Sequence, residues 1–84
     1  MPASPRSPRH RALQALLADL RAAAGLTQMD VANRLSRPQS FVSKYECGER
    51  RLDIIEFIDV VRALGEEPHR VVCKLARLPD VDAT

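Results

Sequence analysis

The chain is poor in the residues on which several classes of protein depend. Its 84 residues include no tryptophan, one tyrosine and only two cysteines, Cys47 and Cys73, which stand far apart. A metal framework needs clustered cysteine and histidine, and neither His10 nor His69 lies at ligand spacing to a cysteine. The sequence therefore predicts no metal site and two reduced thiols, with a disulfide or a redox role as the alternative.

Long apolar runs and catalytic groupings are also missing. No stretch approaches the roughly 20 apolar residues of a membrane helix, and the proline- and arginine-rich residues 1–11 lack the apolar segment of a secretion signal. The histidines, cysteines and acids form no nucleophile–base set, and no glycine-rich loop could cradle a phosphate. We therefore expect a cytoplasmic protein with no catalytic residues, no cofactor and no membrane partner.

What the chain does contain is positive charge gathered in one segment. The net charge is only +2, but five basic residues stand between positions 34 and 51, against Glu46 and Glu49. These basic residues are Arg34, Arg37, Lys44, Arg50 and Arg51. Such clustering suits a nucleic-acid face, but an ordinary solvated surface explains it equally well.

Helical periodicity, interrupted by glycine and proline, predicts five short helices and no strand. Two of them begin with capping boxes, Thr27 with Asp30 and Asp53 with Glu56. The predicted helices cover residues 9–24, 28–35, 38–46, 54–64 and 68–77. The fold class is therefore all-α, with one domain over residues 9–78, a flexible arm over 1–8 and a short tail over 79–84.

Residues 28–47, with the sequence QMDVANRLSRPQSFVSKYEC, fit a helix-turn-helix. Ala32 is small where the two helices cross, and Leu35, Val42 and Tyr45 can form a small core beneath the turn. Four polar side chains then face outward on the second of the two helices: Gln39, Ser40, Ser43 and Lys44. Since every base pair has a distinct donor and acceptor pattern only in the major groove, double-stranded DNA is the expected partner.

The segment from LRAAAGLTQMDVANRL to PQSFVSKYECGERR is similar to the Cro and phage-repressor class of helix-turn-helix proteins, the Xre family. The hallmark is a glutamine at Gln28, a small residue at Ala32, and then Q-S-x-V/I-S-x-Y-E-x-G over residues 39–48. The similarity covers roughly residues 13–75, most of the chain. It implies a five-helix, lambda-repressor-like domain. It also implies a sequence-specific transcriptional regulator that binds an inverted-repeat operator and represses transcription.

The resemblance also implies roles for individual residues. The base-reading positions are Gln39, Ser40, Ser43 and Lys44, and the positions that contact phosphates are Gln28, Arg37, Arg50 and Arg51. Gln28 would in addition brace Gln39. Arg21 and Glu46 match an ion pair that joins the first helix to the third, which is a structural role.

Two positions depart from the family pattern, Ser36 and Cys47, and the role of Phe41 is open. Ser36 stands where the turn most often has a glycine in the left-handed conformation, which serine tolerates poorly, so we expect a slightly recast turn. Cys47 replaces a residue that is more often polar or basic, which removes one possible contact with the DNA backbone. Phe41 either packs against the preceding helix or touches a thymine methyl group, and packing is the favoured interpretation because aromatic residues are more often buried.

Apolar residues near the C-terminus predict a homodimer. Val71 and Leu75 are expected to complete the core, which leaves Val72 and Leu78, with part of Phe57 and Ile58, beyond what one small core can absorb. The single helix of one chain that reads DNA contacts too few base pairs to specify a genomic site, whereas a two-fold dimer reads two half-sites about 34 Å apart. The alternative is that Val72 and Leu78 simply finish the core of a monomer.

A different role for the same fold also stays open. Xre-like domains serve as antitoxins and as controllers of restriction–modification systems, in which binding a partner protein is part of the function. The chain lacks the long C-terminal extension that commonly engages a toxin or a ligand, which favours a stand-alone repressor or controller without choosing between them.

Overall fold

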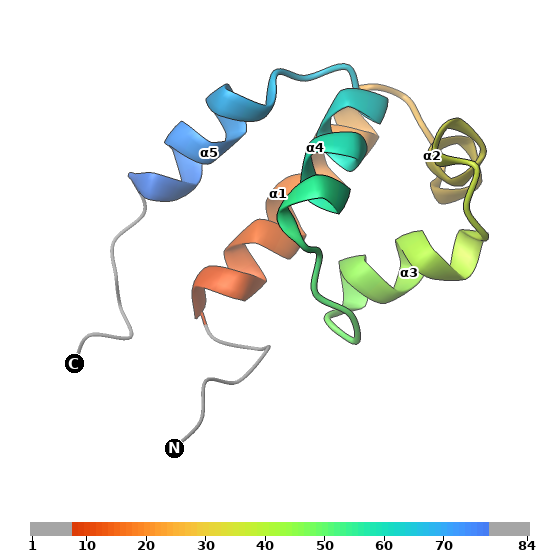
Figure 1. The fold of residues 1–84 in the computed structure, drawn as a ribbon, viewed down its shortest axis with the longest axis horizontal. Coiled ribbons are helices and arrows are strands. Elements are labelled where there is room, and N and C mark those ends of the chain that lie inside the picture. Colours follow the sequence, from red (N-terminus) through yellow and green to blue (C-terminus); the bar gives the residue numbers. More distant parts are fainter. Residues whose placement is uncertain (1–7, 78–84) are drawn as a thin grey trace.

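The computed structural model describes residues 8–77, which form five α-helices and no strand (Figure 1). The helices are α1 (Pro8–Ala23), α2 (Gln28–Leu35), α3 (Gln39–Cys47), α4 (Ile54–Ala63) and α5 (Pro68–Ala76). The predicted all-α, five-helix fold is confirmed. Pro8, expected in the arm, is instead the first residue of α1, where a proline costs no hydrogen bond. The rest of the arm, Leu78 and the tail over 79–84 lie outside the described residues.

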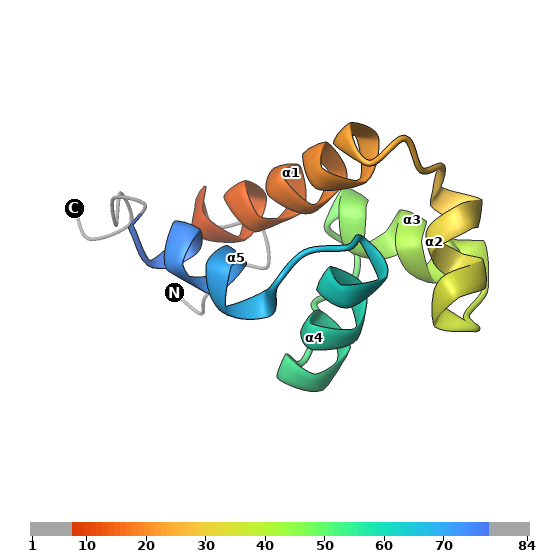
Figure 2. The ribbon, with the colours of Figure 1, turned by 90° about the horizontal axis from the view of Figure 1, so that it is seen from above.

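The helix-turn-helix lies at one end of the molecule and α5 at the other. Figures 1 and 2 show α2 and α3 together at one end of the long axis, with α1 and α4 between them and α5. Helix α3 packs against both α1 and α2, whereas α5 packs against α1 and α4. Helix α3 therefore contacts two other helices, and the side that carries Gln39, Ser40 and Lys44 is exposed.

One apolar core joins all five helices. Its buried members are Leu17, Val31, Ala32, Phe41, Val42, Tyr45, Phe57, Val60, Val61, Leu64 and Val71. Leu35, expected with Val42 and Tyr45 in the small core beneath the turn, is partly buried against this core. Phe57 was expected to be partly surplus, but it is buried and Ile58 packs against the same core. Full burial of a valine, leucine or phenylalanine side chain contributes about 1.5–3 kcal/mol of hydrophobic stabilisation.

Both predicted capping boxes are present. At the start of α2, the Thr27 N–H donates to Asp30 Oδ2 (2.8 Å) and the Asp30 N–H donates to Thr27 Oγ1 (3.0 Å). The Thr27 backbone N–H, followed by its hydroxyl, lowers the pKa of the Asp30 carboxyl below its usual value. At the start of α4, the Glu56 N–H donates to Asp53 Oδ1 (2.7 Å) and the Asp53 N–H donates to Glu56 Oε1 (3.1 Å). Each box satisfies two backbone donors that the helix itself leaves unpaired.

The turn between α2 and α3 is not recast, contrary to expectation. Ser36 itself adopts the left-handed conformation, with φ 55° and ψ 42°, and is the only described non-glycine residue with a positive φ. This conformation lets the Arg37 N–H donate to the Ala32 carbonyl (3.0 Å), which closes the end of α2. A serine therefore adopts the left-handed conformation that was expected to require a glycine, at a cost in backbone strain.

Ser36→Gly is expected to raise the free energy of unfolding by about 1 kcal/mol, because glycine adopts this conformation without the clash of a Cβ atom. Thermal denaturation should then show a melting temperature about 4–8 °C higher. Ser43→Gly, inside α3, is the matched control and should lower the melting temperature, since glycine is unfavourable within a helix. A fall in stability for both variants would show that Ser36 makes a stabilising contact that outweighs its strain.

Candidate nucleic-acid interface

The polar residues predicted to read DNA lie on the free side of α3. Gln39, Ser40 and Lys44 are exposed and Ser43 is half-buried, whereas Phe41, Val42 and Tyr45 on the same helix are buried. This division follows from the helical repeat, because residues three and four positions apart share a face. Three of the four predicted base-reading side chains are therefore accessible to a ligand, and the fourth is accessible in part.

A chain of hydrogen bonds links the first residue of α3 to the first residue of α2. Gln39 Nε2 donates to Gln28 Oε1 (3.3 Å), and Gln28 Nε2 donates to Glu46 Oε1 (2.9 Å). The expected brace of Gln39 by Gln28 is thus present in the structure. Because Gln28 uses both ends of its amide, it fixes the Gln39 side chain relative to the far end of α3.

The ion pair expected between Arg21 and Glu46 is present and has two contacts. Arg21 Nε lies 2.8 Å from Glu46 Oε2 and Nη2 lies 3.1 Å from Oε1, while Nη1 donates to the Leu26 carbonyl (3.0 Å). Such paired, charge-assisted bonds fix both distance and orientation. The hydrogen bond to Glu46 raises the pKa of Arg21 above its usual value. The pair joins α1 to α3 and holds the recognition helix in place.

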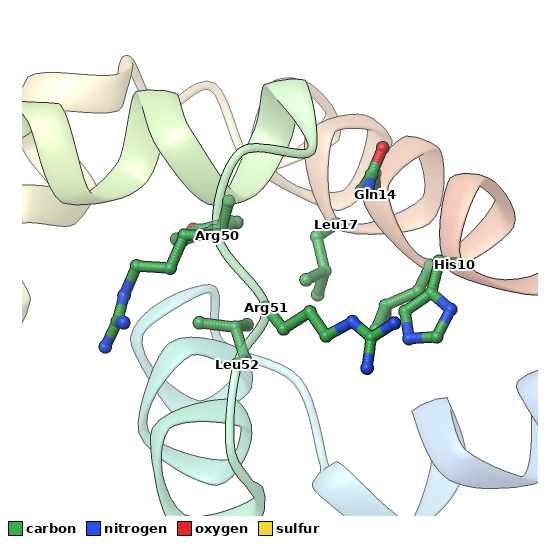
Figure 3. A pocket seen from close by; sticks show the side chains of 8 residues that line it. His10, Gln14, Leu17, Arg50, Arg51 and Leu52 are labelled. Atoms are coloured by element: carbon green, nitrogen blue, oxygen red, sulfur yellow. The ribbon is translucent and has the colours of Figure 1, made fainter. Parts of the chain in front are cut away.

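The two neighbouring arginines of the loop after α3 point in different directions. Figure 3 shows the Arg51 guanidinium beside His10 of α1, at a cavity of about 240 Å³, and Arg50 extending to the opposite side of the loop. Arg50 and Arg37 share a carboxylate partner, Glu56, with Arg37 Nη2 lying 3.2 Å from Glu56 Oε2. Of the three arginines predicted to bind phosphates, Arg37 and Arg50 therefore pair with Glu56, whereas Arg51 extends to the other side of the loop.

Glu56 lies beside two of the predicted phosphate-binding residues, although the sequence indicated only a helix cap at this position. Its partners Arg37 and Arg50 both lie over the Phe41 ring, with guanidinium carbons 4.4 and 5.1 Å from the ring centroid. Phe41 is buried and packs edge-on against Tyr45, with ring centroids 5.5 Å apart. The favoured interpretation of Phe41 as a packing residue therefore agrees with the structure. We call Arg37, Phe41, Arg50 and Glu56 the arginine cluster.

An apolar groove lies away from α3, between α1, α4 and α5. Its volume is about 340 Å³, and its lining residues are Leu13, Leu52, Asp53, Ile54, Phe57, Val72 and Leu75. Val72 is 46% exposed and Ile54 is 64% exposed. The neighbouring Ile55 is also exposed. Sequence reasoning found Val72 and assigned no role to Ile54.

The remaining candidate features of the described part of the chain are metal sites, thiols and membrane-spanning helices. Over residues 8–77, no group of three or more histidine, cysteine or acidic side chains could hold a metal ion. Cys47 and Cys73 are both exposed free thiols. None of the helices in this range combines the length and apolarity that spanning a bilayer requires.

Comparison with known proteins agrees with this geometry. The family model described as a helix-turn-helix domain matches residues 12–83, which is most of the chain. No curated protein is significantly similar in sequence.

Solved structures include several relatives. An XRE-family like protein from Pseudomonas syringae pv. tomato is 54% identical, with a TM-score of 0.80 over 84% of this chain and 88% of that one. The restriction–modification controller protein C.AhdI from Aeromonas hydrophila is 29% identical, with a TM-score of 0.65 over 70% of this chain and 89% of that one. The clp gene regulator ClgR from Corynebacterium glutamicum is 26% identical, with a TM-score of 0.73 over 83% and 74%. The chain belongs to the XRE family of helix-turn-helix DNA-binding regulators.

Proposed function

We propose that the protein is a non-enzymatic transcriptional repressor that binds an inverted-repeat operator as a homodimer and reads each half-site with α3. The observation that carries the proposal is the row of polar side chains on the free side of α3, with its first member held by Gln28. Binding genomic DNA would place the protein in the bacterial cytoplasm.

The chemistry of the row suits the major groove. A glutamine at position 39 can form a bidentate pair with adenine, Lys44 can donate to the acceptors of guanine, and Ser40 and Ser43 can pair with either. The proposed phosphate contacts are made by Gln28, Arg37, Arg50 and Arg51. They surround α3 in the sequence, and such contacts fix the register of a protein on the duplex without reading bases.

A second copy of the chain is the proposed occupant of the apolar groove. One recognition helix contacts only a few base pairs, whereas two helices related by a two-fold axis read half-sites about 34 Å apart. Val72 and Ile54 offer exposed apolar surface at the groove. Of the dimer residues expected from the sequence, Val72 remains in the proposal and Leu78 lies outside the described residues.

Selection of bound sequences from random duplexes tests the proposal directly. The expected result is an enriched site that is an inverted repeat with half-sites one helical turn apart. An enriched site without two-fold symmetry would contradict the dimeric repressor, and no enrichment at all would contradict sequence-specific binding.

Gln39→Ala is expected to weaken binding to the selected site by about 1–3 kcal/mol and to relax the preference at one base position of each half-site. The physical reason is the loss of a bidentate hydrogen bond to a base edge. Binding to a random duplex, measured by fluorescence anisotropy at the same salt concentration, is the control and should change little. An equal loss on both duplexes would mean that Gln39 does not read a base.

A second candidate function is that of a restriction–modification controller, favoured by the likeness to the controller protein C.AhdI. The two functions share a DNA-binding mode and differ in the genes that are regulated. Mapping the selected operator onto the source genome separates them. A site ahead of genes for a methyltransferase and a nuclease supports the controller, and a site elsewhere supports a repressor of other genes.

A further inference from the structure

Glu56 performs two tasks with its two carboxylate oxygens. Oε1 accepts the backbone N–H of Asp53 (3.1 Å) and so completes the cap of α4. Oε2 accepts Nη2 of Arg37 (3.2 Å) and Nη2 of Arg50. Because the cap already fixes the side chain, the carboxylate is a firm anchor for both guanidinium groups.

The contacts with Glu56 leave most N–H donors of each guanidinium available to another partner. A guanidinium carries five N–H donors, and the contacts with Glu56 use only the Nη2 nitrogen of each arginine. The Arg37 side chain is 45% exposed and that of Arg50 is 39% exposed, whereas that of Glu56 is 13% exposed. Phe41 supports both guanidinium groups through its ring. The outer donors of the two arginines are therefore presented to solvent from a rigid base.

The positions of these residues connect the cluster to the recognition helix. Arg37 precedes α3, Arg50 follows it, and Phe41 belongs to it. Glu56 belongs to α4, which packs against α2. One carboxylate thus coordinates the two cationic side chains that flank α3 in the chain.

We propose that Glu56 is a positioning residue for DNA binding, which holds Arg37 and Arg50 in the orientation in which their outer N–H groups donate to backbone phosphates. This inference rests on the proposed function. Positioning strengthens binding because two long side chains are already ordered before DNA arrives, so that less conformational freedom is lost on association.

The charge of Glu56 makes the inference testable, because positioning and simple electrostatics predict opposite results. Glu56 is an acid beside two proposed phosphate contacts, so its neutralisation should strengthen DNA binding if only net charge matters. If Glu56 positions the arginines, its neutralisation should weaken binding even though the protein becomes more positive.

The experiment compares Glu56→Gln with Glu49→Gln by fluorescence anisotropy on one duplex over a series of salt concentrations. Glutamine can still accept the Asp53 N–H and so preserve the cap. Glu49 is exposed in the loop before Arg50 and gives the same change in charge. We expect Glu56→Gln to bind about tenfold more weakly at each salt concentration. Glu49→Gln should bind at least as tightly as the wild type.

Glu56→Asp provides a second variant in case the first fails to fold. Aspartate keeps the charge, and Asp30 already fills the equivalent capping position in α2, but the shorter side chain cannot reach both arginines. It should weaken DNA binding in the same direction with no change in net charge. Circular dichroism establishes that each variant is folded.

The decisive comparison repeats Glu56→Gln in a protein that carries Arg37→Ala and Arg50→Ala. A positioning residue has nothing left to position there, so the substitution should then have no weakening effect. The same weakening without the arginines, or binding by Glu56→Gln as tight as by Glu49→Gln, would overturn the inference alone. Failure of the wild type to bind any duplex would instead overturn the proposed function on which the inference rests.

Discussion

Glu46→Ala is expected to lower the free energy of unfolding by about 3 kcal/mol, because breaking a largely buried ion pair from one side leaves a charge without its partner. The Glu46 side chain is 9% exposed and accepts hydrogen bonds from Arg21 and Gln28. Alanine removes both acceptors at once. For a domain of this size, the loss is a large fraction of its total stability.

Thermal denaturation measures this effect, and Glu49→Ala is its control. About 3 kcal/mol corresponds to a fall of roughly 12–24 °C in melting temperature for a domain of this length. Glu49 is an exposed acid three positions further along, and its removal should change stability by no more than about 0.5 kcal/mol. Equal effects of the two substitutions would show that Glu46 behaves as an ordinary surface charge.

Val72→Asp is expected to convert the proposed dimer to a monomer and to reduce operator binding by at least about a hundredfold, since the second half-site is lost. A carboxylate at the groove would be buried without a partner on association, which is strongly unfavourable. The monomer would retain one recognition helix and lose the second half-site. Analytical ultracentrifugation at micromolar concentration should then show a species near the 9.4 kDa of one chain.

Cys73→Asp is the matched control for this prediction. Cys73 is the next residue of α5, is exposed, and does not line the groove. The variant should remain dimeric and bind the operator normally. A wild-type protein that sediments as a monomer under the same conditions would remove the homodimer from the proposed function.

Local sequence signals predicted the fold because they act within a few residues. The helical periodicity, the capping boxes at Thr27 and Asp53, and the glycines and prolines that interrupt the pattern each depend on residues close together in the chain. The Arg21–Glu46 pair and the Gln28–Gln39 brace came from the family resemblance, and the structure contains both. Periodicity alone would not have paired residues so distant in the chain.

The features that sequence reasoning missed depend on tertiary geometry. Glu56 has a second carboxylate oxygen, and its use for Arg37 and Arg50 depends on how α4 packs against α2 and so brings Glu56 to the residues that flank α3. Ile54 and Ile55 follow the apolar pattern of α4 but lie in its first turn, beyond the reach of the core. Ser36 was judged by residue preference, whereas the hydrogen bonds that close α2 hold it in the left-handed conformation.

The hydrogen-bonded chain from Arg21 through Glu46 and Gln28 to Gln39 has a consequence for the design of new specificities. Residues 39 and 46 lie on α3, but their partners lie on α1 and α2. A recognition helix transplanted from another regulator would therefore arrive without the side chains that orient it. A hybrid protein that changes position 39 or 46 must exchange Gln28 and Arg21 together with the helix, so the smallest unit that can be transferred between regulators is larger than α3.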